Sequence, residues 1–414
     1  MAKNAKFLNT LLACILITSA AYAEPLLTVE RAIETALAHD ALIQVYQSQR
    51  DAYKEQSVAE DTLPDPKIKL GLMNVPTDTY KFNQEPMTQV QLGIQQMFPR
   101  GDSLEIKSQR ATSQSNAQQA KVNNQKRTIK NDVRETWLEH FYWLNAEQVV
   151  IENKRLFNKL VSVTQQQYAA GRQEQQDVIR SELELGMLDD KELNIRTQLQ
   201  ITKAKLSKLI GQDISAFKLS TDIPEFNLNR KLSTNGHPML HMENAKVSMN
   251  QNNVDLAKQS FKPSWMLDVT YGKRETSALG VERADFLSAM VVFDLPLFTA
   301  DKQDKKVAAS KYRLNSALNQ QEERKRELNR MLQVNLEKEK NLSLRVTKYQ
   351  QALVPKAKEN TSAAMFAYQS GRGAFAALMR AQITELETQL SALRLTVEHK
   401  KSQAKLLYLA GEEK

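Results

Sequence analysis

The sequence predicts a mainly α-helical fold with a small number of membrane-type β-strands, on three observations. The chain of 414 residues contains only 12 glycines, whereas an average usage of about 7% would give roughly 29. Two long stretches, 102–170 and 301–370, contain no glycine and a single proline, Pro355. Four shorter runs alternate between apolar and polar residues. Sandwiches, doubly wound α/β folds and TIM barrels all need regular turns, so this pattern excludes them.

The first residues have the pattern of a secretory signal peptide, which we expect over 1–23. Lys3 and Lys6 form a charged n-region, Phe7 to Ile17 is an apolar h-region, and Ala21-Tyr22-Ala23 is an A-x-A cleavage site. Cys14 also resembles a lipoprotein site, but the apolar region continues on both sides of it. Because Cys14 is the only cysteine, the chain has no disulfide framework.

The charges favour a solvated surface rather than a nucleic-acid site. The chain has 57 Lys and Arg against 48 Asp and Glu, a formal net charge of +9, and both signs are interleaved. No nucleic-acid partner is expected, because no basic stripe is interleaved with aromatic residues. The sequence contains no P-loop, G-x-G-x-x-G, G-x-S-x-G or H-E-x-x-H motif. We therefore expect neither an enzyme nor a bound cofactor.

One local cluster could bind a metal. His237, Met239, His241 and Met242 lie within six residues, and imidazole and thioether ligands suit Cu(I). The alternative is the start of a helix whose methionines fill gaps in its packing. The alternative is the simpler interpretation, so no metal site is predicted.

The chain is predicted to be an internal duplication. Tyr168-Ala-Ala-Gly171-Arg172 corresponds to Tyr368-Gln-Ser-Gly371-Arg372, and Gly211 corresponds to Gly411. Each half has a helical segment (28–60 or 238–259), two strands, a long helix, a Gly-Arg turn and a second long helix. The predicted organisation is a signal peptide over 1–23, a first repeat over 24–211, a linker over 212–236, a second repeat over 237–411 and a tail over 412–414.

The strands have one apolar face each. Ile68, Leu70 and Leu72 alternate with Lys67, Lys69 and Gly71, and the runs near residues 90, 267 and 290 follow the same rule. Their length of about 7–10 residues suits a tilted strand that crosses a bilayer. Four strands cannot close a barrel, and an open edge in hydrocarbon costs several kcal/mol per unpaired group. Closure would therefore need several chains.

The stretch 102–170 would be roughly 100 Å long if it is wholly helical, far longer than a globular core. Apolar residues recur in it at spacings of three and four, as at Ile129, Val133 and Trp137, and Ile151 continues the series. Polar residues flank this narrow stripe, which is typical of a coiled-coil seam.

Taken together, the signal peptide, the duplication, the two strand pairs and the two helical hairpins with Tyr-x-x-Gly turns resemble the TolC family of outer-membrane efflux channels. The segment 63–101, from Leu63-Pro-Asp-Pro-Lys to Gln96-Met-Phe-Pro-Arg-Gly101, is similar to the branch that works with heavy-metal efflux pumps.

The resemblance implies a homotrimer in the outer membrane. Three chains would supply a 12-stranded β-barrel, four strands per protomer, continued by a long α-helical barrel through the periplasm. The implied partners are a periplasmic adaptor and an inner-membrane pump of the RND type, and the implied cargo is heavy-metal cations. Alternative cargoes are drugs, or proteins in type I secretion. A different class of protein, a periplasmic coiled-coil adaptor or structural rod, would explain the helices but not the strands.

Polar side chains on the strands would keep such a channel wet. Alternatively, they are polar only because they do not face lipid. The expected lumenal residues are Lys67, Lys69, Gln91, Gln95, Asp268 and Asp294.

The Gly-Arg turns should form the periplasmic tips, with Gly171 and Gly371 in the left-handed conformation that ends a helix. The resemblance implies that the tips contact the adaptor and close the channel. The family often has acidic residues six and nine positions after the second glycine. This chain has Ala377 and Arg380 there, and Asp177 and Arg180 in the first half, so an acidic ring is not expected. The expected contact residues are Tyr168, Gly171, Arg172, Tyr368, Gly371 and Arg372, and the expected gate residues are Asp177, Arg180 and Arg380.

These tip arginines would suit carboxylates on a partner or a neighbouring subunit. The alternative is that they are cations favoured by a helix terminus.

Overall fold

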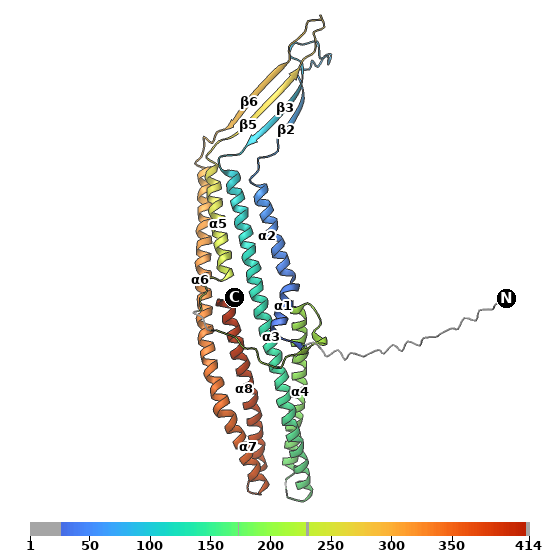
Figure 1. Cartoon of the computed structure of the whole chain (residues 1–414), viewed down its shortest axis with the longest axis vertical. Helices are drawn as coiled ribbons and strands as arrows, with labels where there is room; N and C mark the ends of the chain where they lie inside the picture. The colour runs from blue at the N-terminus through green and yellow to red at the C-terminus, as the bar shows by residue number, and fades with distance from the viewer. Residues whose placement is uncertain (1–25, 173, 229–231, 411–414) are drawn as a thin grey trace, which may run out of the picture.

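The computed structural model describes residues 26–172, 174–228 and 232–410. The expected signal peptide, Cys14 and the tail at 412–414 lie outside the described residues. The molecule is elongated, with a small sheet at one end and two helical hairpins that reach the other end (Figure 1). No helix in the described part of the chain is both long and apolar enough to cross a membrane.

The sheet contains four antiparallel strands in the order β2-β3-β5-β6. They are β2 (Lys67–Met73), β3 (Gln89–Phe98), β5 (Ser264–Lys273) and β6 (Phe286–Asp294). All four predicted alternating runs therefore form strands. A two-residue parallel pair, β1 (Leu26–Leu27) with β4 (Lys218–Leu219), lies halfway along the molecule.

The first half contains four helices: α1 (Val29–His39), α2 (Ala41–Ala59), α3 (Ser103–Ala169) and α4 (Gln175–Ile210). The sequence predicted one continuous helical segment over 28–60, but the structure has two helices there, α1 and α2, separated at Asp40. Asp40 adopts an extended conformation, and its carboxylate accepts a hydrogen bond from the backbone N–H of Ile43 at 2.7 Å. This N-cap satisfies an unpaired donor of α2 and begins a new helix there.

The second half contains α5 (Pro238–Gln259), α6 (Gln303–Lys348), α7 (Val354–Gln369) and α8 (Phe375–Ala410). A turn of π-helix, η2 (Tyr349–Leu353), joins α6 to α7. Pro355, the second residue of α7, has no N–H to donate, so the regular hydrogen-bond ladder cannot continue through this point. The counterpart α3 runs without interruption for 67 residues.

The apolar seam of α3 begins as predicted and then shifts. Ile129, Val133 and Trp137 are buried, but Ile151 is 41% exposed and Val150 is buried in its place. A helix with 3.6 residues per turn drifts relative to a seven-residue repeat, so the buried position moves along a long helix. Further down, Phe157 and Leu160 of α3 share a core with Phe375 and Leu378 of α8.

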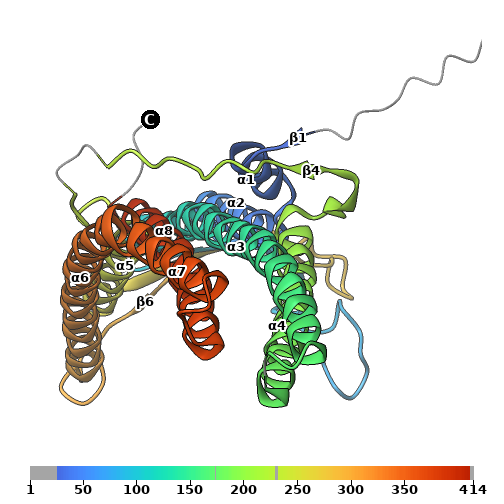
Figure 2. The same ribbon diagram turned by 90° about the horizontal axis from the view of Figure 1, so that it is seen from below.

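Seen along its length, the helical part is an arc (Figure 2). The helices α6 and α4 lie at its two ends, and α8 and α3 lie between them. The segment after α4 crosses the convex side, together with β1, β4 and α1. This segment contacts the arc through Glu225, 2.5 Å from the Lys400 amine, and through Phe226, whose ring lies 5.4 Å from the Arg134 guanidinium.

Candidate functional site

One face of the sheet is apolar and exposed across all four strands. Leu70 of β2 and Leu287 of β6 are each 77% exposed. A contiguous apolar surface of this kind marks a contact with a membrane or another protein. The exposed apolar side chains include Ile68, Leu70, Leu72, Val90, Leu92, Ile94, Trp265, Tyr271, Leu287, Val291 and Phe293.

The opposite face contains the polar residues that the sequence singled out. The strand register pairs Lys67 with Gln95 and Gln95 with Asp268, and side chains two apart on a strand share a face. The six expected lumenal residues all lie on this face, namely Lys67, Lys69, Gln91, Gln95, Asp268 and Asp294. Their common face is an observation, whereas their lumenal role stays a prediction.

An ion pair links two strands that are not neighbours. The Lys69 amine of β2 lies 2.9 Å from a carboxylate oxygen of Asp268 on β5. In the register, Gly93 of β3 pairs with Lys69 on one side and with Thr270, two residues from Asp268, on the other. A Cβ at Gly93 would lie 2.6 Å from the Thr270 hydroxyl and 3.3 Å from Lys69 Cε. The missing side chain therefore leaves the space through which Lys69 reaches its partner.

The sheet has two unpaired edges within the described chain. β2 pairs only with β3, and β6 pairs only with β5. Both outer strands therefore present a row of backbone N–H and C=O groups without strand partners. A single chain leaves this sheet open.

Both hairpin tips have the same backbone geometry. Gly171 has φ of 70° and Gly371 has φ of 71°, the left-handed conformation predicted for them. The N–H of Arg172 donates to the carbonyl of Gln167, and that of Arg372 donates to the carbonyl of Ala367. Such bonds satisfy carbonyls at the end of a long helix and turn the chain sharply.

The tip arginines point to solvent. Arg172, Arg180, Arg372 and Arg380 are all exposed, and the structure pairs none of them with a carboxylate among the described residues. Asp177 is half-buried and does have a polar interaction. The four cations are thus available to a partner, although whether one contacts them stays a prediction.

The two tip tyrosines differ although they occupy equivalent repeat positions. Tyr168 is 47% exposed. Tyr368 is half-buried, and its ring packs 5.7 Å from that of Phe375. Burial raises the pKa of the Tyr368 phenol. A hydrogen bond with the Thr164 hydroxyl lowers this pKa, and the negative charge of Asp177 raises it further. The second hairpin therefore packs against the first, where Thr164 and Asp177 lie, while Tyr168 lies on an uncovered side.

A stripe along α4 shows the same asymmetry. Ile179, Leu183 and Met187 are 57%, 61% and 59% exposed and lie four residues apart, on one side of the helix. The equivalent α8 positions include Met379, which is 1% exposed, and Ile383, which packs against the core between the hairpins. In α8 the first repeat covers Met379 and Ile383, whereas the third equivalent position, Glu387, is exposed. In α4 no described residue of the same chain buries the stripe.

The His/Met cluster lies at the start of α5. His237 is buried, and its Nδ1 accepts a hydrogen bond from the N–H of Met239 at 3.2 Å. This bond makes His237 the N-cap of α5, while His241 is exposed one turn later. No group of three or more His, Cys, Asp or Glu in the described ranges could hold a metal ion. The arrangement favours a helix start, the interpretation chosen from the sequence.

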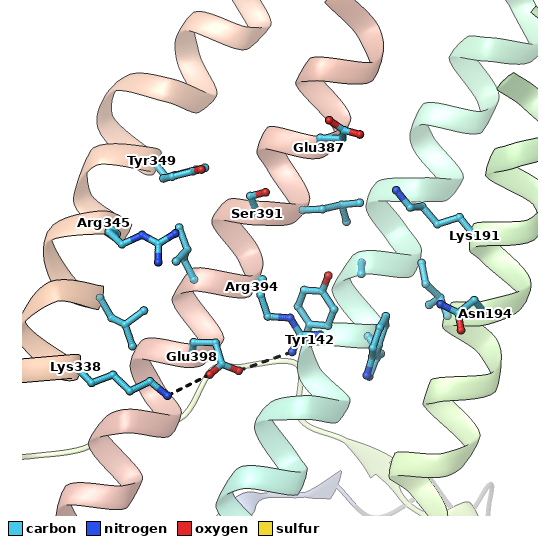
Figure 3. Close-up of a pocket in the computed structure, with 16 residues that line it drawn as sticks. Tyr142, Lys191, Asn194, Lys338, Arg345, Tyr349, Glu387, Ser391, Arg394 and Glu398 are labelled. Atoms are coloured by element: carbon cyan, nitrogen blue, oxygen red, sulfur yellow. Dashed lines mark ion pairs between the residues drawn. The ribbon is translucent and has the colours of Figure 1, made fainter. Parts of the chain in front are cut away.

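Sequence reasoning missed a groove of about 800 Å³ that four helices line. Its residues come from α3, α4, α6 with η2, and α8, with Tyr142 and Arg394 at its centre (Figure 3). The guanidinium of Arg394 lies 3.4 Å from the centre of the Tyr142 ring. No local motif could have identified this site, because its parts are up to 256 residues apart in the chain.

Beside the groove, Arg394 pairs with Glu139 of α3 at 2.9 Å, and Lys401 also contacts Glu139. Burial alone would raise the pKa of Glu139, but the hydrogen bonds and charges of Lys401 and Arg394 outweigh it and hold that pKa below its usual value. Glu139 is therefore a carboxylate at neutral pH, and it fixes the α8 cations against α3.

Comparison with known sequences gives one family match. The sequence model of the family described as "Outer membrane efflux protein" matches residues 32–212. This range covers the first predicted repeat, 24–211, except for its first eight residues, and extends one residue beyond its end. None of the curated proteins compared with the chain matches it.

Solved structures match nearly the whole chain. The outer membrane protein VceC from Vibrio cholerae has a TM-score of 0.77 at 18% identity, over 92% of this chain and 96% of that one. A membrane protein from Pseudomonas aeruginosa has a TM-score of 0.80 at 15% identity, over 94% of each chain. The outer membrane channel CmeC from Campylobacter jejuni has a TM-score of 0.76 at 13% identity, over 92% of this chain and 85% of that one.

These likenesses confirm the predicted fold class, a TolC-like chain of long helical hairpins with a four-stranded sheet. The expectation of a non-enzymatic protein agrees with the matching family, whose description is that of an outer membrane efflux protein.

Proposed function

We propose that this chain is the outer-membrane channel component of a tripartite efflux system and conducts its cargo passively. The observation that carries the proposal is the sheet, whose one face is apolar and exposed on all four strands, at the end of hairpins roughly 100 Å long. Lipid would cover that face, and the hairpins would extend through the periplasm. The family match over 32–212 supports the same function.

The active form in this proposal is a homotrimer. The β6 edge of one copy would pair with the β2 edge of the next, so that three copies close a 12-stranded barrel. This arrangement removes every open strand edge, as hydrocarbon requires. The two repeats, 24–211 and 237–411, would then alternate around the ring as six similar units, and the linker 212–236 would lie outside.

The exposed stripe of α4 supports this assembly. If neighbouring repeats pack alike, Ile179, Leu183 and Met187 of one chain contact the second hairpin of the next, as Met379 contacts the first hairpin within a chain. Tyr168 would be covered in the same way. Burying these apolar side chains would contribute favourably to association.

The trimer is tested by placing charges on this stripe. Ile179→Glu with Leu183→Glu should convert the purified protein from trimers to smaller species in detergent, measured by light scattering. The matched control is Gln200→Glu with Ala204→Glu, which adds the same charge at exposed sites of α4 at least 13 residues away from the stripe. Trimers that persist in the stripe variant would contradict the interface.

The partners in this proposal are a periplasmic adaptor, which contacts the hairpin tips, and an inner-membrane pump of the RND type, which supplies the energy. The chain itself supplies a water-filled path, with Lys67, Gln91 and Gln95 among the residues that line it. The location would be the outer membrane, with a periplasmic extension.

We further propose heavy-metal cations as the cargo. The support is the similarity of segment 63–101 to the heavy-metal branch of the family. Deletion of the gene should sensitise the host to metal salts, and restoring it should reverse this. Sensitivity to drugs alone, or loss of a secreted protein, would identify one of the alternative cargoes.

The experiment that separates a channel from a periplasmic rod is membrane fractionation. A channel sediments with the outer membrane and needs detergent for extraction, whereas a rod or adaptor is released with the periplasm. Single-channel currents in planar bilayers then test conduction directly. Soluble protein without currents would refute the proposal.

A further inference from the structure

The methionines of the sheet all lie on its polar face. Each strand contains one: Met73 in β2, Met97 in β3, Met266 in β5 and Met290 in β6. The register and the alternation of side chains place all four on the same side as Asp268. The apolar face of these four described strands contains no methionine, although it is rich in leucine, isoleucine, valine and aromatic residues. Methionine, whose thioether sulfur can bind a metal, is therefore confined to the polar face.

Three of these methionines are neighbours in the register. Met97 pairs directly with Met266, and Met290 pairs directly with Asp268, two residues from Met266. Directly opposed residues have Cβ atoms roughly 4.5–5.5 Å apart, and diagonal neighbours such as Met266 and Met290 are roughly 7–8 Å apart. The strands β3, β5 and β6 that contribute them lie side by side (Figure 1). Because a methionine side chain is long and flexible, sulfurs at these spacings can converge on one ion.

The side chains of these three methionines are accessible. Met97 is 50% exposed and Met290 is 53% exposed, while Met266 is half-buried. Methionines that fill gaps in a core are buried, so packing does not account for exposed ones on a polar face. Met73 lies at the other end of the sheet, and its sulfur already accepts a hydrogen bond from the Gln91 amide at 3.1 Å. Within the described chain, the sulfurs of the other three methionines have no such donor.

The charges on this face are mostly paired. Asp268 pairs with Lys69 at 2.9 Å. Asp294 pairs with Arg100. Lys67 is exposed and is the one charge of this face without an ion pair among the described residues. Such a surface does not suit a hard divalent cation, which needs several oxygen ligands. Thioether sulfur instead selects soft cations, and it does so without a negative charge.

We propose that Met97, Met266 and Met290 form a binding site for soft monovalent cations, Ag(I) or Cu(I), with the three thioether sulfurs as ligands. This deepens the proposed function, because it names the class of heavy-metal cation, and it rests on that function only for the placement of the site in a conduit. Exposed thioethers on an open face would let the ion leave again, as conduction requires. The binding itself is a property of the purified protein.

The test is isothermal titration calorimetry of silver nitrate, in a chloride-free buffer, into the purified full-length protein in detergent. We expect a saturable site for Ag(I) in each chain. Combining Met97→Leu, Met266→Leu and Met290→Leu should weaken this binding about tenfold or more, a loss of about 1.4 kcal/mol or more. Leucine keeps a similar apolar volume and removes the sulfur, so the sheet should fold as before. Zn(II) at equal concentration should not displace the bound Ag(I).

The matched control removes three methionines outside the sheet. Met87→Leu, Met242→Leu and Met249→Leu together should leave the affinity for Ag(I) unchanged. Met242 belongs to the His/Met cluster at the start of α5, so this control also reports whether that cluster is the source of the binding. An equal loss of affinity in the control and in the sheet variant would overturn the proposal.

A second readout locates the ion. In protein whose methionines have 13C-labelled methyl groups, the NMR signals of Met97, Met266 and Met290 are assigned by their loss in single leucine variants. These three signals should shift when Ag(I) is added, whereas the signal of Met87 should not. Shifts confined to methionines outside the sheet would contradict the site.

Absence of saturable binding, displacement by Zn(II), or an unchanged affinity in the sheet variant would also overturn the proposal. Currents in planar bilayers separate this result from the proposed function. A protein that binds Ag(I) at these methionines but conducts no ions would have the site without the channel. A protein that conducts ions but keeps its Ag(I) affinity in the sheet variant would be a channel without the site.

Discussion

The Lys69 amine and the Asp268 carboxylate, 2.9 Å apart, join β2 to β5 across the intervening strand β3. Asp268 also accepts hydrogen bonds from the Thr270 hydroxyl at 2.7 Å and from the Gln95 amide at 3.5 Å. Three of the four strands are therefore tied together on the polar face by one carboxylate. The contact depends on Gly93, which has no side chain to block it.

Gly93 should therefore not tolerate a side chain. Gly93→Ala places a Cβ 2.6 Å from the Thr270 hydroxyl and 3.1 Å from a backbone carbonyl of β5, so the Thr270 side chain must rotate and the β5 backbone must shift by a few tenths of an ångström. We expect the yield of folded protein in outer membranes to fall several-fold. Gly71→Ala is the control, because its Cβ would meet only the Gln91 side chain at 4.0 Å. Equal yields of both variants would show that the close approach at Gly93 has no importance for folding.

Asp268→Asn should change the ion selectivity of the channel. The substitution removes one negative charge per chain and leaves the Lys69 amine uncompensated on the polar face. In planar bilayers under a KCl gradient, the reversal potential should move by several millivolts toward that of chloride. Asp268→Asn combined with Lys69→Met removes both charges and should return the potential close to its original value. Unaltered selectivity in the Asp268→Asn variant would show that the polar face of the sheet does not line the ion path.

The tip arginines should be needed for efflux but not for assembly. Arg172→Glu with Arg372→Glu reverses exposed charges that have no carboxylate partner within the described chain, so folding should be unaffected. Efflux should be abolished if these arginines contact carboxylates on the adaptor or hold the gate. Host resistance and trimer content are measured together. Arg155→Glu with Arg313→Glu, at exposed sites on α3 and α6, is the control. Full resistance in the Arg172→Glu with Arg372→Glu variant would show that these arginines are only solvent-exposed charges and are not needed for efflux.

The stability of the helical part should fall below neutral pH because of buried histidines. Burial, followed by the charges of Arg127 and Arg324, lowers the pKa of His237 to about 4, and burial lowers that of His140 to about 4 as well. An unfolded histidine has a pKa of about 6.5. Between these values the unfolded chain binds more protons, so stability is present above about pH 6.5 and is lost as the pH falls toward 4.

His237→Asn tests this, because Asn retains an acceptor for the N-cap of α5 but does not titrate. Its apparent melting temperature should fall less than that of the parent protein when the pH is lowered from about 7 to about 5. The measurement is circular dichroism at the helix band, with the exposed His39→Asn as control. The same pH dependence in both variants would argue against a buried neutral His237.

The periodic elements could be predicted from the sequence, because local patterns encode them. Strand alternation fixed which residues share a face, so the six polar residues from Lys67 to Asp294 were grouped correctly before any register was known. The left-handed glycines at 171 and 371 followed from their place after long helices. The break at Asp40 was missed although Asp is a favoured N-cap, because the apolar period continues across it.

Contacts between distant segments could not be predicted. Nothing near Lys69 identifies Asp268, and nothing near Glu139 identifies Arg394, 255 residues away. The groove is a stronger case, since its lining residues include Tyr142 of α3, Lys191 of α4 and Arg345 of α6. In the sequence, Lys191 and Arg345 are indistinguishable from the many solvated cations of a coiled coil.

The bare edges of β2 and β6 have a consequence for biogenesis. A solitary copy inserted into lipid would have to expose both rows of backbone polar groups to hydrocarbon, at several kcal/mol for each group. Under the proposed arrangement, insertion and association must therefore occur as a single concerted event. The bilayer would then favour the insertion of complete rings over partial ones, because only a complete ring leaves no strand edge unpaired.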